Sequence, residues 1–501
     1  MGDSLSALVI FAYLVITLLI GLIAGARGER DASDFVAGDR AFGPFVLYFV
    51  MGAMLFSAYT LLGTPQRIMT RGPDVFYIIA FGSVCFVPMY YFGAKVRSIG
   101  AREGYVTQAE LVGARFGSRL VTSVMGVSSL VAFLPYLLIQ LKAAGLVMEA
   151  ALGWDRSFGA AAVYAVVITY VVLGGMRGVG WTNVIQGVVM VIVVWALGIW
   201  IPRTMYGGVA AMFDQVVATR PEYIVLPGPA ERPTSAFAYT SEVLVSALGF
   251  TMWPQVFMKC FTARSARLVR FSVVVFPSFL IFIVPLIFLG YAALLQTQAG
   301  APSDETVILW LVQHPEFGGG PIVAAFLSFA ILAASMSTGD ALLHGAGSIF
   351  VRDVLVVGLG FTIDARLETR VMRAMIVVFG ALGVCLLELV GETSVVDLLL
   401  LGYAIPLQFL PPVILGLYWR RATRAAAEWG LCCGLGTVVA LFCLNQLAPA
   451  LYARLNPFSL ELGVFGLAIN LALMVGLTLA RSPAGARATP QPRPRARSDA
   501  P

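Results

Sequence analysis

Long apolar segments separated by short polar stretches recur along almost the whole chain. About 20 consecutive apolar residues form a helix long enough to cross the hydrocarbon core of a bilayer. Each segment therefore predicts one membrane-spanning helix. Thirteen segments fit this description, with approximate ranges 4–26, 43–70, 74–96, 119–152, 158–176, 180–202, 237–263, 268–296, 321–351, 370–391, 393–419, 425–446 and 459–480. The pattern predicts an all-α integral membrane protein.

The second segment contains a run of small and hydroxyl-bearing residues, VMGAMLFSAYTLLGTPQ at 50–66. Gly and Pro weaken the hydrogen bonding of a helix, and in a bilayer the released carbonyls must be buried in protein or face a water-filled cavity. A helix broken at mid-depth is typical of the binding site of a transporter. The alternative is a helix whose small residues only permit close packing.

The seventh segment carries a similar interruption, with Gly249 and Pro254 in the run GFTMWPQ. The two interrupted segments lie five helices apart, so residues 43–202 and 237–419 form two halves of five helices each. An odd number of crossings inverts the second half relative to the first, which is the inverted-repeat design of many secondary transporters. The halves share no convincing residue-level similarity, so the repeat is inferred from the pattern alone.

The ninth segment offers uncharged oxygen ligands near its middle. Ala334 precedes Ser337 by three residues and Thr338 by four, so its carbonyl shares a helix surface with both hydroxyls. Three uncharged oxygens suit a weakly bound monovalent cation, whereas calcium and magnesium prefer carboxylates. The alternative is that the hydroxyls bond back to their own helix.

Depth in the membrane places a second set of oxygens at the same level. At about 1.5 Å per residue, Ser337 lies roughly 24 Å along a helix of roughly 45 Å, and Ala53 and Phe56 lie about 15–20 Å along one of roughly 40 Å. Both groups fall near the midplane. Two backbone carbonyls from the broken second segment would complete a cation site begun on the ninth.

Composition supports a membrane protein and argues against other classes. Hydrophobic residues make up 59% of the chain and charged residues 12%, against a usual charged share of about 25%. The six cysteines lack metal-type spacing, and two histidines are too few for a histidine-rich metal site. Without a concentrated nucleophile, base or metal constellation, we expect no enzyme.

The basic residues indicate an orientation. With the N-terminus outside, 25 Lys and Arg residues, Lys259 among them, fall in inside loops and the C-terminal tail, and 7, including Arg67, fall outside. Cytoplasmic loops carry the excess of basic residues, so we expect a multi-pass protein of the cell membrane with its C-terminus in the cytoplasm. The net charge of +6 reflects this topology rather than nucleic-acid binding. We expect residues 1–480 to form one transmembrane domain and residues 481–501 a disordered basic tail.

Five motifs in order resemble one known family, the sodium/solute symporters. They are SDFVAGDRAFGP at 33–44, SAYTLLGTP at 57–65, GG ending at 175 followed by WTNVIQG at 181–187, MWPQVFMKCFTARS at 252–265, and LAASMSTGDALLHGAGSIFVRD at 332–353. Members of the family carry proline, sugars, pantothenate, monocarboxylates or sialic acid. The resemblance implies the LeuT-type 5+5 inverted repeat, with one extra helix before the core and two after it.

The resemblance also implies a sodium site at positions that match the family motif. Its ligands would be the carbonyls of Ala53, Phe56 and Ala334 and the hydroxyls of Ser337 and Thr338. These are the groups that the depth argument selects. The chain departs from the family pattern twice. Leu55 stands where some relatives have an aspartate and Asn183 where many have one, and both departures bear on ion affinity and coupling.

Polar residues of the fourth segment are the first candidates for holding a solute. Lys142 or Gln140 would bind a carboxylate, and Tyr136 shares a helix face with Gln140. The alternatives for Lys142 are snorkelling to the interface or pairing with Glu149. Further substrate candidates are Ser57, Tyr59, Phe250, Trp253, Gln255 and Tyr403, and Asp340 and Asn183 have supporting roles.

These patterns together predict a sodium-coupled secondary symporter that imports a small organic solute, with a carboxylate favoured, by alternating access. Lys142 and the absence of an acidic cluster suited to a cationic solute favour the carboxylate. Alternatives are a proton-coupled symporter with Asp340 as the carrier, or a transporter-like membrane sensor. The expected partners are the solute, sodium and the lipid bilayer, and the oligomeric state stays open.

Overall fold

Helices form the described part of the chain, which in this computed structural model covers residues 2–26, 32–53, 56–230, 234–296, 320–390 and 402–480. The first half contains α1 (Gly2–Gly25), α2 (Ala32–Ala37), α3 (Pro44–Gly52), α4 (Thr64–Arg71), α5 (Tyr77–Val84), α6 (Val87–Glu103), α7 (Gln108–Phe116), α8 (Arg119–Leu152), α9 (Arg156–Tyr206) and α10 (Val209–Thr219). The second half contains α11 (Ala236–Phe250), α12 (Pro254–Phe257), α13 (Lys259–Thr262), α14 (Ala266–Val275), α15 (Val284–Gln296), α17 (Gly320–Ile349), α18 (Ala365–Val390), α20 (Leu410–Tyr418), α21 (Arg424–Leu447), α22 (Pro449–Leu455) and α23 (Leu462–Ala480).

The apolar segments of the sequence correspond to long helices. Among the described residues, nine helices are long and apolar enough to cross a membrane, and the bent pair α11 with α12–α13 makes a tenth. The prediction of an all-α, multi-pass membrane protein is confirmed. The number thirteen stays a prediction, and the tail 481–501 lies outside the described residues.

The longest helix, α9, covers two of the predicted segments. Its 51 residues would extend about 76 Å if straight, more than twice the thickness of a hydrocarbon core. The backbone breaks at Gly175, where φ is 53° and ψ is −154°. Only glycine adopts this conformation readily, and a Cβ here would also lie 2.9 Å from the Phe35 ring. Gly175 therefore separates the two stretches of α9.

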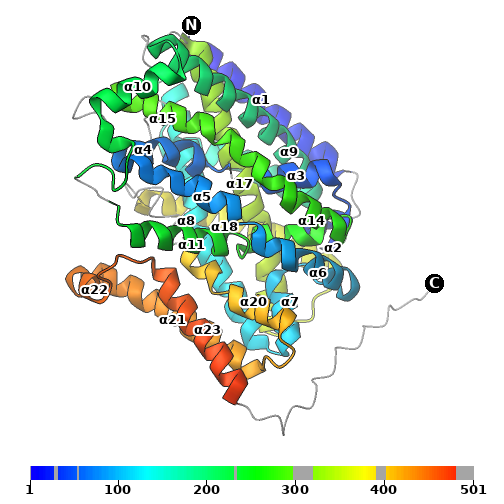
Figure 1. The fold of residues 1–501 in the computed structure, drawn as a ribbon. Helices are drawn as coiled ribbons and strands as arrows, with labels where there is room; N and C mark the ends of the chain where they lie inside the picture. The colour runs from blue at the N-terminus through cyan, green and yellow to red at the C-terminus, as the bar shows by residue number, and fades with distance from the viewer. Residues whose placement is uncertain are drawn as a thin grey trace.

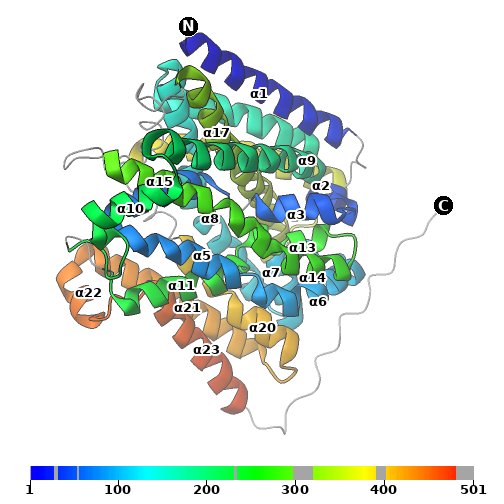
Figure 2. The same cartoon turned by 45° about the horizontal axis from the view of Figure 1, so that its top comes forward.

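Helix α17 forms the centre of the bundle (Figure 1). In the span that it begins, Val323–Gly358, 89% of the most apolar window is buried, and α17 packs against α1, α8, α9 and α18. The corresponding figure is 28% for α1, α21 and α23. These three helices occupy the periphery, with α1 on one side of the bundle and α21 and α23 on the other (Figures 1 and 2). Their exposed apolar side chains are the surface that lipid covers.

Backbone pairing joins two distant segments at one end of the bundle. Phe42, just before α3, donates its N–H to the carbonyl of Thr262 at 3.1 Å and accepts from Arg264 at 3.0 Å. The guanidinium of Arg40 adds bonds to the carbonyls of Phe261 and Tyr105, at 3.2 and 2.9 Å. Burial, and then the nearby charge of Arg97, lower the pKa of Arg40 to about 10, so that it stays charged at neutral pH.

We expect Gly175→Ala to destabilise the protein by about 1–3 kcal/mol, because a side chain strains this backbone conformation. Thermal unfolding of the purified protein in detergent measures the loss. The matched control is Gly436→Ala in α21, where a Cβ meets nothing within 4 Å and alanine favours the helix. Equal stability of the two variants would contradict a strained break in α9.

Candidate functional site

The first predicted break lies between α3 and α4. Helix α3 ends at Gly52, and a π-helical turn, Tyr59–Gly63, precedes α4. Gly52 permits close packing, because a Cβ there would lie 2.2 Å from the ring of Phe279. Beyond the break, the N–H of Ala58 donates to the side-chain oxygen of Gln140 in α8, at 3.1 Å. A polar backbone group that the helix does not satisfy is thus satisfied by another helix.

Gln140 also connects this break to α17. Its backbone carbonyl accepts a hydrogen bond from the Ser335 hydroxyl at 2.7 Å, and its side-chain nitrogen donates to the carbonyl of Tyr136 at 3.1 Å. Gln140 is fully buried. Two hydrogen bonds through this one residue therefore link Ala58, two residues after Phe56, with Ser335, two residues before Ser337.

The five expected sodium ligands lie on these two connected segments, and all are buried: Ala53, Phe56, Ala334, Ser337 and Thr338. The Ser337 hydroxyl donates to the carbonyl of Ala334 at 3.1 Å, which is the bond to its own helix that the sequence left open. The Thr338 hydroxyl makes no ordinary hydrogen bond to any described residue, although the Tyr136 side chain faces both it and Ser57. Leu55, the first departure from the family pattern, lies outside the described residues.

The second predicted break lies between α11 and α12. Trp253 adopts an extended conformation, with φ −55° and ψ 124°, and the two halves bend by 46°. Its ring lies 5.1 Å from the ring of Tyr136 and 5.6 Å from that of Tyr403, in an edge-to-face arrangement with the latter. The structure thus brings three substrate candidates together. Tyr59 lies within electrostatic range of Tyr136 and Tyr403, and its hydroxyl bonds that of Tyr77.

The remaining substrate candidates have contacts of their own. Phe250 packs against Phe86, with ring centroids 5.4 Å apart. Gln255 is buried and lies next to Gly345 of α17, where an added Cβ would be 3.7 Å from that of Gln255. Lys142 is only partly buried, unlike Gln140 two residues earlier. Glu149, the partner considered for Lys142, forms an ion pair with Arg156 at 2.5 Å.

The supporting candidates Asp340 and Asn183 lie in a polar cluster beside the site. The Asp340 carboxylate accepts hydrogen bonds from the hydroxyls of Tyr170 at 2.9 Å and Thr182 at 3.4 Å, and Asn183 also interacts with it. Lys259 contributes a nearby positive charge and is itself only 3% exposed. Tyr170, Thr182 and Asn183 belong to α9, so this cluster joins α9, α13 and α17.

The assignment of Lys259 to an inside loop was therefore wrong. Lys259 begins α13, the helix that continues the second broken segment, and its amine approaches the sulfur of Met176 at 3.5 Å. The break directs the following helical turn, with Lys259, into the bundle. A count of basic residues in loops takes Lys259 for a loop residue, because it does not allow for such a bend. The sequence held one signal, since Lys259 follows Pro254 within an otherwise apolar run.

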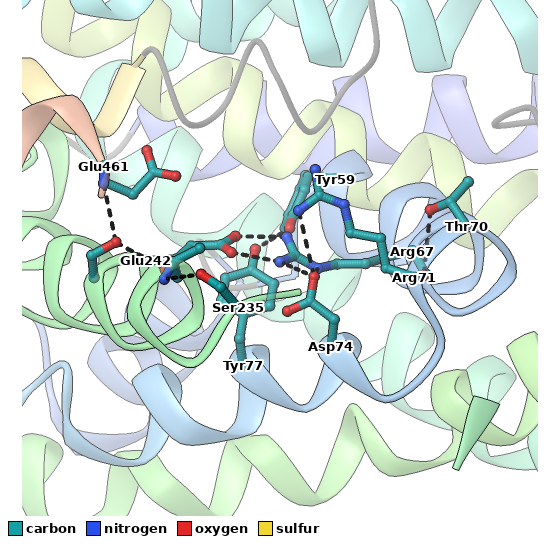
Figure 3. A network of polar contacts seen from close by, with 11 residues as sticks. Tyr59, Arg67, Thr70, Arg71, Asp74, Tyr77, Ser235, Glu242 and Glu461 are labelled. Carbon is teal, nitrogen blue, oxygen red and sulfur yellow. Dashed lines mark hydrogen bonds and ion pairs between the residues drawn. The ribbon is translucent and has the colours of Figure 1, made fainter. Parts of the chain in front are cut away.

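Arg67 was also assigned wrongly, to an outside loop, and is buried in α4. Both of its terminal nitrogens donate to Glu242 of α11 at 2.6 Å, and it also bonds Asp74 at 2.7 and 3.1 Å (Figure 3). The ring of Tyr77 lies 3.9 Å from the guanidinium carbon, and the Tyr77 hydroxyl bonds that of Tyr59. This ionic network joins α4 and α11, the helices that follow the first break and precede the second.

Comparison with known proteins decides the family. The model of the sodium:solute symporter family matches residues 35–434. The chain belongs to the sodium:solute symporter family. The resemblance of its motifs is therefore confirmed, and membership makes this a sodium-coupled solute symporter.

Two relatives align with this symporter over nearly their whole length. It is 26% identical to an uncharacterised symporter, YhjB, of Bacillus subtilis (strain 168), over 94% of this chain and 96% of the relative. It is also 26% identical to a monocarboxylate transport permease protein of Rhizobium johnstonii, over 94% and 95%. Among solved structures, a sodium-coupled sialic acid symporter in its substrate-bound, outward-open state matches with a TM-score of 0.79 and 17% identity, covering 95% of this chain and 98% of that one. This likeness shows the fold.

We expect Arg67→Met to destabilise the symporter by about 3–5 kcal/mol, because the buried carboxylates of Glu242 and Asp74 would both lose the charge of Arg67. Thermal unfolding in detergent measures the change. Arg71→Gln is the control, since Arg71 also pairs with Asp74, at 3.5 Å, but is 41% exposed. Its loss should stay below about 1 kcal/mol. Similar melting temperatures for the two variants would contradict a stabilising role of the Arg67 network.

Proposed function

We propose that the protein imports a small carboxylate together with sodium by alternating access. Sodium is held by the carbonyls of Ala53, Phe56 and Ala334 and the hydroxyls of Ser337 and Thr338. A cation that binds the outward-facing state more tightly shifts the conformational equilibrium toward it, and this differential binding couples sodium to solute.

One observation supports the proposed sodium site most directly. The path from Ala58 through Gln140 to Ser335 holds the broken segment against α17, each contact being a hydrogen bond of about ordinary length. Thr338 adds a buried hydroxyl oxygen without an ordinary hydrogen bond among the described residues. Buried polar groups normally have partners, and a bound cation would supply one here.

Other observations support the proposal that the solute is a carboxylate. Tyr136, Trp253 and Tyr403 form an aromatic wall beside the proposed sodium site. Lys142 on the same helix as Tyr136 would supply a positive charge, and one relative that aligns over nearly its whole length is a monocarboxylate transport permease protein. Ser57, Tyr59, Gln140, Phe250 and Gln255 complete the proposed surroundings of the solute, with Asp340 and Asn183 in support.

The proposed topology has thirteen crossings, an inverted repeat over residues 43–202 and 237–419, an outside N-terminus and a cytoplasmic C-terminus. Removing the buried Lys259 and Arg67 from the loop charges takes one residue from each side. The excess of basic residues on the cytoplasmic side is unchanged.

Replacing Ser337 or Thr338 by Ala should raise the sodium concentration needed for half-maximal uptake by about tenfold or more, since each removes a ligand. Proteoliposomes with a sodium gradient measure this. The control is Ser348→Ala in the same helix, whose hydroxyl donates to the carbonyl of His344 at 2.9 Å. Unchanged sodium dependence in both site variants would refute the proposed ligands.

Proton coupling through Asp340 is the second candidate, favoured by the complete burial of this carboxylate beside Lys259. Uptake measured with sodium replaced by choline at fixed pH distinguishes the two. We expect uptake to be lost in choline. Uptake that persists in choline and follows an imposed proton gradient would establish proton coupling instead.

Lys142→Met should weaken binding of the carboxylate by about tenfold, because a charge-assisted hydrogen bond is lost. A sodium-dependent binding screen of the purified protein against small acids, amino acids and sugars first selects the solute. Arg203→Met is the control, as it removes an exposed positive charge at the end of α9. Equal affinity of wild type and Lys142→Met would remove Lys142 from the site.

A further inference from the structure

A groove lies between α6 and α14, away from the sodium site. It has a volume of about 730 Å³, and Tyr418, the last residue of α20, also lines it. Helices α6 and α14 pack side by side in both orientations of the structure (Figures 1 and 2). Its polar lining consists of Lys95, Ser98, Arg267, Arg270 and the hydroxyl-bearing rings of Tyr91 and Tyr418.

The charges of this groove suit an anion. Three of its lining residues are cations and none is an acid. Arg267 and Arg270 are exposed, and neither guanidinium has a hydrogen bond or ion pair with any residue that the structure describes. Lys95 lies 4.4 Å from the centre of the Tyr418 ring and donates to the carbonyl of Leu417. The groove therefore has two uncommitted guanidinium groups and one anchored ammonium.

The start of α14 adds to this positive potential. Helix α14 begins at Ala266, and the Ser265 hydroxyl caps it by accepting from the N–H of Leu268. The N-terminus of a helix attracts anions through its free N–H groups and its dipole. Arg267 lies in this first turn, so guanidinium and backbone donors are available in the same place.

An apolar surface runs from the cationic end of the groove along both helices. On α6, Val87 and Tyr91 precede Lys95 at four-residue spacing and are 50% and 65% exposed. On α14, Phe271 and Val274 follow Arg270 by one and four residues and are 53% and 65% exposed. Residues three or four apart share a helix face, so each helix presents cations at one end and an apolar surface over the adjoining turns. A small soluble anion would leave this apolar surface exposed, whereas the acyl chains of a lipid would cover it.

We propose that this groove binds an anionic phospholipid. Its phosphate lies between Arg267, Arg270 and Lys95, and its acyl chains lie along the apolar faces of α6 and α14. The proposal uses the orientation given under the proposed function, in which these residues face the cytoplasmic leaflet. Basic pockets between membrane helices on that side suit anionic headgroups. The site adjoins Ala263, where the backbone pairing with Phe42 joins the two broken segments.

The test titrates the purified full-length protein in detergent with phosphatidylglycerol and follows its melting temperature and the lipid retained in native mass spectrometry. Phosphatidylcholine with the same acyl chains and inorganic phosphate are run in parallel. We expect phosphatidylglycerol to raise the melting temperature and to remain bound, and the other two to do neither. Equal stabilisation by inorganic phosphate would overturn the lipid assignment, and equal stabilisation by phosphatidylcholine would overturn the headgroup assignment.

Substitutions in the groove test whether phosphatidylglycerol binds there. Arg267→Gln with Arg270→Gln should weaken phosphatidylglycerol binding by roughly tenfold or more, since each basic residue near a membrane surface adds to the attraction. The matched control is Arg366→Gln with Arg370→Gln, which removes two exposed arginines from α18 on the same side. Equal weakening by the control pair, or none by the groove pair, would overturn the proposal. Val274→Asn tests the acyl contact separately and should weaken lipid binding while leaving both arginines in place.

Discussion

The need to satisfy backbone polar groups inside the membrane governs this structure. Two helices are interrupted in the interior of the bundle, and the hydrocarbon offers no partner for the groups that an interruption releases. At the first interruption, Gln140 accepts the N–H of Ala58, and its own carbonyl accepts the hydroxyl of Ser335. A single buried residue therefore joins α8 to the broken segment through its side chain and to α17 through its backbone carbonyl. The oxygens expected to hold sodium lie on the segments that Gln140 connects.

The same low dielectric explains the buried charges. An uncompensated charge away from water is costly, so Arg67 is surrounded by Glu242 and Asp74, and Lys259 lies near Asp340. The Arg67 network joins α4 to α11. The pairing of Phe42 with Thr262 and Arg264 joins the start of α3 to the end of α13. The two broken segments are thus linked to each other at both of their ends.

The helices at the periphery differ from the central helix in how much of their apolar surface is buried. Helix α17 is nearly enclosed, whereas α1, α21 and α23 expose most of their surface, which is apolar because lipid covers it. Where α6 and α14 reach the end of that apolar surface, Lys95, Arg267 and Arg270 take its place. The outer surface therefore combines apolar helix faces that suit acyl chains with a cationic groove that suits an anionic headgroup.

The sequence by itself determined the class of the fold, the family and the two interrupted segments. Hydrophobic length and Gly and Pro positions are local properties, and they retain their meaning whatever the tertiary structure. Only the tertiary structure decided which side chains bond the backbone polar groups that these interruptions release. The charge pattern of the sequence placed Arg67 and Lys259 in loops, and no pattern predicted that Gln140 bonds the backbone at the first break, because a sequence does not show which helix lies opposite a break. Partners such as Ala58 and Gln140 are 82 residues apart, and contacts of that range arise only when the helices pack.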